Sequence, residues 1–162
     1  MFQPKKQTPL SKAEAYLKVA SFCAYQDRCR QEVREKLYTY ELTDSEVEDI
    51  LEKLEKEKFL NEERFAKAFA GGKFRLKKWG RIKIKQELKM RAIPDAYIRK
   101  ALGDINEEEY TEILNGLLEK KKQAERLKNT MEGKQKLLRY ALSKGYEQDL
   151  IWDGITTLFA ED

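Results

Sequence analysis

One pattern of apolar and polar positions occurs three times along the chain. It occupies residues 30–54, 81–105 and 134–158, which align without an internal gap when Val33, Ile84 and Leu137 are superimposed. Equivalent residues are therefore 51 and then 53 positions apart. The other matched columns are Leu37, Leu88 and Ala141; Leu42, Ile93 and Tyr146; Val47, Ile98 and Ile151; Leu51, Leu102 and Ile155; and Leu54, Ile105 and Leu158. Repetition at a nearly fixed period is the sequence signature of a repeat architecture.

Each repeated segment has the apolar spacing of two helices joined by a turn. Ile84 and Leu88 are four residues apart, on one face of a helix, and Ile98, Leu102 and Ile105 follow in steps of four and three. A further amphipathic stretch precedes each pair. These stretches contain Tyr16, Leu17 and Ala20; Phe65, Phe69 and Phe74; and Tyr110, Leu114, Leu117 and Leu118. The pattern predicts nine helices in an all-α fold of three tandem three-helix repeats.

The turn between the paired helices has recognisable chemistry. "TDSE" at 43–46 fits a capping box, in which Thr43 and Glu46 bond each other's free backbone N–H groups. Gly145 can take the left-handed conformation that ends a helix. Glu41 and Ala92 occupy the equivalent positions in the first two segments, so we expect those turns to close differently.

The repeats divide the chain into four parts. A unit of about 50 residues buries too little surface to be stable alone, so neighbouring units should pack into an elongated array. Pro4 and Pro9 oppose early helix formation, which predicts a flexible start. The predicted parts are a tail at 1–10 and repeats at 11–60, 61–105 and 106–162.

Composition argues against catalysis and against bound cofactors. Among 162 residues, 38% are charged and none is His, which removes the commonest general acid and base and every Ser-His or Cys-His nucleophile. Cys23 and Cys29 lack further metal ligands and are predicted to be small, semi-buried side chains. No Gly-rich phosphate loop, secretory signal or membrane span is recognisable. We expect a cytoplasmic protein that is no enzyme and holds no metal or cofactor.

Most aromatic residues fall at the periodic positions and are assigned to the core rather than to a ligand. Phe74 and Trp79 differ, because they lie among cations. Stacking on nucleic-acid bases is one role open to them, although packing against the next repeat is preferred. The aromatic residues assigned to the core are Phe65, Phe69, Tyr97, Tyr146 and Trp152.

Charge is arranged in blocks of alternating sign. Residues 41–63 contain ten acidic and three basic side chains, whereas 73–91 contain nine basic and one acidic. A further basic block, with eight basic and two acidic residues, lies at 120–139. Soluble helix faces can explain the acidic blocks, but like charges four residues apart repel, and such a cluster suits an anionic partner. The predicted contact residues are Lys73, Arg75, Lys77, Lys78, Arg81, Lys83, Lys85 and Lys89.

Residues 61–102, "NEERFAKAFAGGKFRLKKWGRIKIKQELKMRAIPDAYIRKAL", resemble the signature region of the RecX family. The pattern is an "-E-RF" opening, basic residues, a Lys-x-Gly step, an "-I--EL" helix and a final "I" helix. "KLLRYALSKGYEQDLIWDGI" at 136–155 resembles that family's last repeat, and the resemblance covers about residues 11–160. The residues that carry the middle pattern are Arg64, Phe65, Lys78, Gly80, Ile84, Glu87, Leu88, Ile93 and Ile98.

The resemblance implies a curved array that regulates the RecA recombinase in DNA repair, homologous recombination and the SOS response. Such a regulator would act as a monomer that binds RecA and its filament on single-stranded DNA, restraining ATP hydrolysis and strand exchange. Two alternatives stay open: a helical nucleic-acid-binding protein without a recombinase partner, and a scaffold that binds a protein through its acidic faces. The 51- and 53-residue spacings match neither the TPR nor the ankyrin period, which weakens the scaffold hypothesis.

Overall fold

The structure is a computed structural model, and it describes residues 9–160. This part of the chain contains nine α-helices and no β-strand, which confirms the all-α prediction. Residues 1–8 of the predicted N-terminal tail lie outside the described residues. The helices are α1 (Lys12–Tyr25), α2 (Arg30–Tyr38), α3 (Asp44–Lys56), α4 (Glu62–Lys77), α5 (Arg81–Met90), α6 (Asp95–Gly103), α7 (Glu107–Glu125), α8 (Met131–Lys144) and α9 (Gln148–Ala160).

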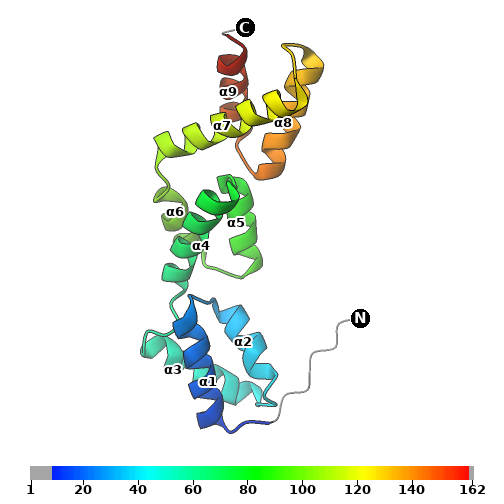
Figure 1. Cartoon of the computed structure of the whole chain (residues 1–162). Coiled ribbons are helices and arrows are strands. Elements are labelled where there is room, and N and C mark those ends of the chain that lie inside the picture. Colours follow the sequence, from blue (N-terminus) through cyan, green and yellow to red (C-terminus); the bar gives the residue numbers. More distant parts are fainter. Residues whose placement is uncertain (1–8, 161–162) are drawn as a thin grey trace.

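The nine helices form three tandem units in an elongated array (Figure 1). Helices contact one another chiefly within a unit: α1 with α2 and α3, α4 with α5 and α6, and α7 with α8 and α9. The second helix of each unit, α2, α5 or α8, lies on the same side of the array (Figure 1). We call the three groups the first, middle and last units. The predicted architecture of three-helix repeats is therefore confirmed.

A short polar side chain caps the first helix of every unit. Ser11, Asn61 and Asn106 each accept a hydrogen bond from the backbone N–H three residues ahead, at 2.9–3.1 Å. Such caps satisfy N–H groups that have no partner inside the helix. The predicted capping box at α3 is also present, because Thr43 and Glu46 exchange backbone hydrogen bonds of 3.1 and 3.2 Å.

The turn after the second helix contains a left-handed residue at the same position in all three units. Gly145 has a φ of 97°, but Glu41 and Ala92 are also left-handed, with φ values of 59° and 57°. The prediction that the first two turns close differently is thus wrong. Left-handed backbone is unfavourable for a residue with a Cβ, so the packing of the next side chain must hold it there. The buried residues that follow are Leu42, Ile93 and Tyr146.

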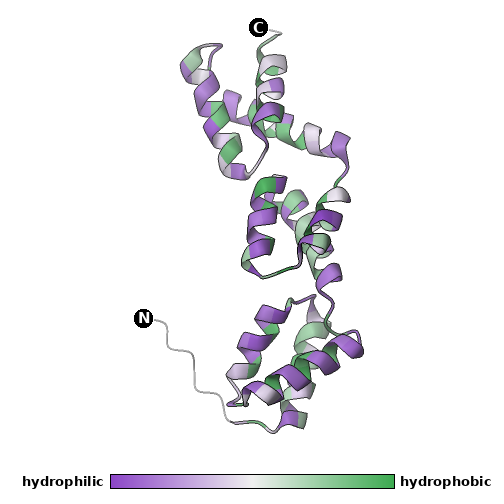
Figure 2. Cartoon of the chain, turned by 180° about the vertical axis from the view of Figure 1, so that it is seen from behind, coloured by the Kyte–Doolittle hydropathy of each residue, from purple (hydrophilic) through white to green (hydrophobic). Residues whose placement is uncertain are grey.

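Buried apolar side chains form two cores rather than three. The first unit has its own core, built around Val33, Leu37 and Leu51. A second core runs through both the middle and the last units, from Ile84 and Leu88 to Leu137. Hydrophilic and hydrophobic residues alternate along the helices (Figure 2), as an amphipathic helix requires. The middle and last units are therefore packed more closely to each other than to the first.

Polar contacts dominate where the first unit meets the middle unit. Asp27 accepts a hydrogen bond from Nε of Arg64 at 2.5 Å, and Glu62 accepts one from the backbone N–H of Arg30 at 3.3 Å. Cys29 provides the apolar part, since its side chain is fully buried and belongs to the core of the other two units. Both Cys29 and Cys23 are buried free thiols, more deeply enclosed than the semi-buried state predicted.

Candidate anion-binding surface of the middle unit

The basic stretch at 73–91 spans the end of α4, a tight turn and all of α5. At the turn, the backbone N–H of Gly80 donates to the carbonyl of Lys144 at 2.8 Å, and that of Ile82 donates to Gly145 at 2.9 Å. A Cβ at position 80 would lie 2.3 Å from the carbonyl oxygen of Gly145. The turn is therefore joined directly to the last unit, and only glycine fits there. Gly80 also interrupts the row of basic residues.

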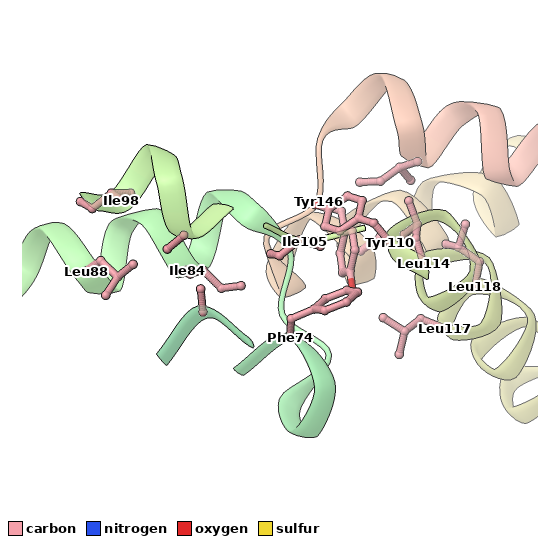
Figure 3. Packing of buried hydrophobic residues seen from close by; sticks show 14 of the residues in the cluster. Phe74, Ile84, Leu88, Ile98, Ile105, Tyr110, Leu114, Leu117, Leu118 and Tyr146 are labelled. Carbon is pink, nitrogen blue, oxygen red and sulfur yellow. The ribbon is translucent and has the colours of Figure 1, made fainter. Parts of the chain in front are cut away.

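Three aromatic rings fill the space behind this turn (Figure 3). Phe74 stacks on Tyr110 with a centroid distance of 5.7 Å, and Tyr110 meets Tyr146 at 5.0 Å. The Tyr146 hydroxyl donates to the carbonyl of Lys78 at 2.9 Å. Since Tyr110 and Tyr146 come from the last unit, the preferred prediction for Phe74, packing against the next repeat, is confirmed. The cluster fixes where the basic turn lies.

Arg81 forms part of this junction. Its guanidinium donates a hydrogen bond to the Glu107 carboxylate at 2.7 Å and lies 4.0 Å from the centre of the Tyr110 ring. Its Nε is 3.0 Å from a Glu147 carboxylate oxygen, an ion pair that lacks hydrogen-bond geometry. Burial acts to lower the Arg81 pKa, but hydrogen bonds to Glu107 and Tyr110 and the Glu147 charge raise it overall. The charge of Arg81 is compensated inside the protein, which sets it apart from the neighbouring lysines.

Trp79 lies between two lysines that approach its ring. Nζ of Lys73 is 5.0 Å from the ring and Nζ of Lys83 is 4.7 Å from it, distances typical of cation–π contacts. The Phe69 ring packs edge to face against Trp79, with a centroid distance of 6.5 Å. The Arg91 guanidinium lies over the Phe69 ring, 4.7 Å from its centroid. Trp79 is partly buried against the core, so part of its ring packs inside the unit and part is exposed at the surface beside the two ammonium groups.

The remaining predicted contact residues lie in three places. Lys77 and Lys78 are exposed at the end of α4, where Lys78 ends the helix in a left-handed conformation. Lys85 and Lys89 lie one turn apart on α5 and line a cleft of about 340 Å³ with Asp95 and Arg99 of α6. Arg75 lines a different cleft, with Lys67, Asp104 and Glu109. The eight predicted side chains therefore form no single patch.

Sequence reasoning left one cation of this surface out of the predicted set. Arg91 lies inside the same basic stretch, and its guanidinium is held at this surface by a cation–π contact with Phe69. From the sequence, Phe69 was assigned to the core alone. Phe69 is only partly buried. Within residues 9–160, no group of three or more His, Cys, Asp or Glu side chains could hold a metal ion, and no helix has the length and apolarity to cross a membrane.

Family comparisons match each of the three units separately. The first three-helix domain of RecX matches residues 15–54, the second matches 61–102, and the third matches 107–155. The regulatory proteins RecX of Bacillus cytotoxicus and Bacillus cereus are each 27% identical to the chain over 138 residues. Each alignment covers 85% of this chain and 51% of the relative, so the chain spans about half the length of these curated relatives.

Solved structures give the same result at the level of the fold. The crystal structure of RecX from Lactobacillus salivarius superimposes with a TM-score of 0.82 and 23% identity, covering 91% of this chain and 96% of that one. Another, described as regulatory protein RecX, gives 0.79 and 23% over 88% of this chain and 71% of its own. Because the three domain matches cover most of the sequence in the order of its units, the chain belongs to the RecX family of regulatory proteins.

Proposed function

We propose that this protein binds the RecA recombinase, in particular its filament on single-stranded DNA, and inhibits ATP hydrolysis and strand exchange. The observation that carries the proposal is the ordered match of all three units to the domains of RecX. In this proposal the protein acts by occupying a surface, as a binding protein and not as an enzyme.

The surface lysines of the middle unit suit a polyanionic assembly. Lys77, Lys85 and Lys89 are exposed, and among the described residues no carboxylate lies within 4.0 Å of their ammonium groups. An ammonium group without an internal partner can neutralise a phosphate or an acidic side chain of a filament. Arg81 is excluded from this set, because Glu107 and Glu147 already balance its charge.

Inhibition by this route is steric and electrostatic. An elongated array of units would contact more than one subunit of a filament, and its lysines would strengthen each contact. Two neighbouring contacts held by one chain bind more tightly than either alone, because the second forms at a high effective concentration. Bound in this way, the array would oppose the subunit movements that accompany ATP hydrolysis.

The test is DNA-dependent ATP hydrolysis by the cognate recombinase with increasing amounts of this protein. We expect inhibition below one protein per recombinase subunit, weakening as salt is raised. A variant with Lys77→Gln, Lys85→Gln and Lys89→Gln should inhibit about tenfold less effectively, because each substitution removes a positive charge that would attract the filament's phosphates or carboxylates.

A matched control removes three other lysines. Lys18→Gln, Lys53→Gln and Lys56→Gln take away the same charge from exposed positions of the first unit, which lie outside the basic stretch. This variant should inhibit like the unchanged protein. Absence of inhibition by the unchanged protein would refute the recombinase hypothesis, and DNA binding without inhibition would favour the simpler nucleic-acid-binding protein.

A further inference from the structure

Rings and lysines alternate across the junction between the middle and last units. In the middle unit, Trp79 lies between Lys73 and Lys83. In the last unit, Tyr140 of α8 has Nζ of Lys121 at 4.8 Å and Nζ of Lys144 at 6.0 Å from its ring. Each unit therefore presents one aromatic ring flanked by two ammonium groups.

The two groups meet at the junction itself. A Cβ on Gly145 would lie 2.4 Å from Cβ of Lys83, so the backbone beside Lys144 touches the base of the Lys83 side chain. Helices α5 and α8, which carry these residues, lie on the same side of the array (Figure 1). We define the cation–ring strip as Lys73, Trp79, Lys83, Lys144, Tyr140 and Lys121.

The strip is accessible and retains net positive charge. All six side chains are neither fully buried nor fully exposed. Within residues 9–160 no carboxylate lies within 4.0 Å of the ammonium groups of Lys73, Lys83 or Lys144, whereas Lys121 pairs with Glu125 at 2.8 Å. A surface lysine over a ring gains only about 1 kcal/mol, so a phosphate can draw it away.

We infer that the cation–ring strip is a track for single-stranded nucleic acid. Its ammonium groups bind successive phosphates, and Trp79 and Tyr140 receive unstacked bases. An acidic protein surface would use the lysines but has no need of rings between them, whereas aromatic platforms in a basic groove are the usual means of holding single strands. The inference deepens the proposed function, on which it rests, by assigning the DNA contact to this side of two units.

The direct test uses the fluorescence of Trp79. The chain has two tryptophans, so a Trp152→Phe variant leaves Trp79 as the sole emitter. Titration with a 15-nucleotide oligothymidylate at low salt should quench it in a saturable way, because a base stacks on the indole. A duplex of the same length hides its base faces and should quench less at equal occupancy.

Variants in the last unit test whether the track crosses the junction. Tyr140→Leu keeps an apolar side chain but removes the ring, and should weaken oligothymidylate binding about tenfold. Lys121→Gln with Lys144→Gln should lower the slope of log affinity against log salt by about 1.4, corresponding to the removal of two phosphate-binding groups. The control, Lys53→Gln with Lys56→Gln at exposed positions of the first unit, should leave both affinity and slope unchanged. Circular dichroism and urea unfolding establish that each variant stays folded.

Several results would overturn the inference. These are binding without quenching of Trp79, equal quenching by the duplex, and unchanged affinity in the last-unit variants. Equally effective displacement of the oligonucleotide by polyglutamate would point to an acidic protein instead. The recombinase assay separates this failure from that of the proposed function: inhibition that survives without strip-dependent DNA binding refutes only the track. Strip-dependent DNA binding without inhibition refutes only the recombinase role.

Discussion

Between the middle and last units, two backbone hydrogen bonds, three packed aromatic rings, the ion pairs of Arg81 and a shared apolar core hold the chain together. Between the first and middle units, the contacts include Arg64 with Asp27 and with the carbonyls of Lys58 and Phe59, Glu62 with the Arg30 backbone, and the buried thiol of Cys29. Figures 1 and 3 show the two cases, a narrow connection after α3 and a packed one around Tyr110. Units of one fold are thus joined by different chemistry.

The difference has a physical consequence for the whole array. Salt weakens exposed ion pairs, which occur at both junctions, but leaves packed rings and an apolar core unaffected, and only the junction of the middle and last units has these as well. The middle and last units should therefore move as one body, with the first unit attached more loosely. This arrangement would also keep the two halves of the cation–ring strip in a fixed relation.

The largest expected effect comes from adding one carbon at the tight junction. Gly80→Ala places a Cβ against the backbone of Gly145 and Tyr146, where no side chain can move aside. We expect a loss of about 3 kcal/mol in the free energy of unfolding, as in other overpacked sites. Urea unfolding followed by circular dichroism measures it.

The matched control is Gly72→Ala on α4, where nothing lies within 4 Å of the added Cβ. Since alanine favours helix over glycine, this variant should gain about 0.5–1 kcal/mol. Equal effects of the two substitutions would contradict the close contact at Gly80.

Alkaline pH should act on the looser junction through Cys29. Burial raises the pKa of its thiol to about 11 from an ordinary value of 9.0. The folded protein therefore holds this proton more tightly than the unfolded chain, so the stabilisation is complete below pH 9 and is lost as pH rises toward 11. Between these values the wild type should lose about 2 kcal/mol more than a Cys29→Ala variant. Unfolding curves at pH 8, 9, 10 and 11 test this difference.

The tighter junction should also lose stability at alkaline pH. Burial, with the Glu147 hydrogen bond as the next contribution, raises the pKa of Tyr110 above its ordinary value of 10.0. The folded protein therefore holds this proton more tightly than the unfolded chain, and the stabilisation is lost as pH rises above 10. A Tyr110→Phe variant should lose less stability than the wild type between pH 10 and 11, and an unchanged pH dependence in that variant would contradict this role of the hydroxyl.

Removal of one hydroxyl measures the polar part of the tight junction. In Tyr110→Phe, Glu147 loses its donor and the backbone N–H of Arg81 loses an acceptor at 3.0 Å. We expect a loss of about 1 kcal/mol in unfolding free energy. Tyr38→Phe, whose hydroxyl donates to Asp44 at the surface at 2.9 Å, serves as control and should change stability by less than about 0.5 kcal/mol.

The smallest effect is expected at the ion pair of the looser junction. Arg64→Gln removes the contact with Asp27, a partly exposed pair, and should destabilise by about 0.5 kcal/mol at low salt. In about 1 M salt the difference from wild type should vanish, because screening removes most of the pair's attraction. Arg99→Gln, an exposed arginine of α6, is the control. A salt-independent loss would mean that Arg64 acts through its hydrogen bonds to the carbonyls of Lys58 and Phe59 and not through its charge.

Much of the fold could be predicted because apolar spacing is a local property of the sequence. The residues of the six matched columns are buried, except for Leu102 and Leu158, which are partly buried. The capping box at Thr43 formed as expected. The turn at Ala92 was mispredicted, because its left-handed backbone is fixed by burial of Ile93 and not by the residue itself.

The candidate site was harder to predict from the sequence, because a basic residue of one unit can be neutralised by acidic residues of the next unit. Arg81 resembles its lysine neighbours in sequence, but Glu107 and Glu147 lie in the last unit and become partners only in the folded chain. Tyr140 likewise gains its flanking lysines through folding, since Lys121 belongs to another helix. Charge counts locate a basic stretch, but folding decides which of its charges remain available.

The division of the apolar interior into two cores bears on how the molecule melts. A linear array with unequal couplings between neighbours need not unfold in one all-or-none step. Calorimetry should then resolve two heat-absorption peaks, one for α1–α3 and one for α4–α9, with a calorimetric enthalpy above the van't Hoff value. The two-core interior thus predicts two thermodynamic domains within residues 9–160, although the three units share one architecture.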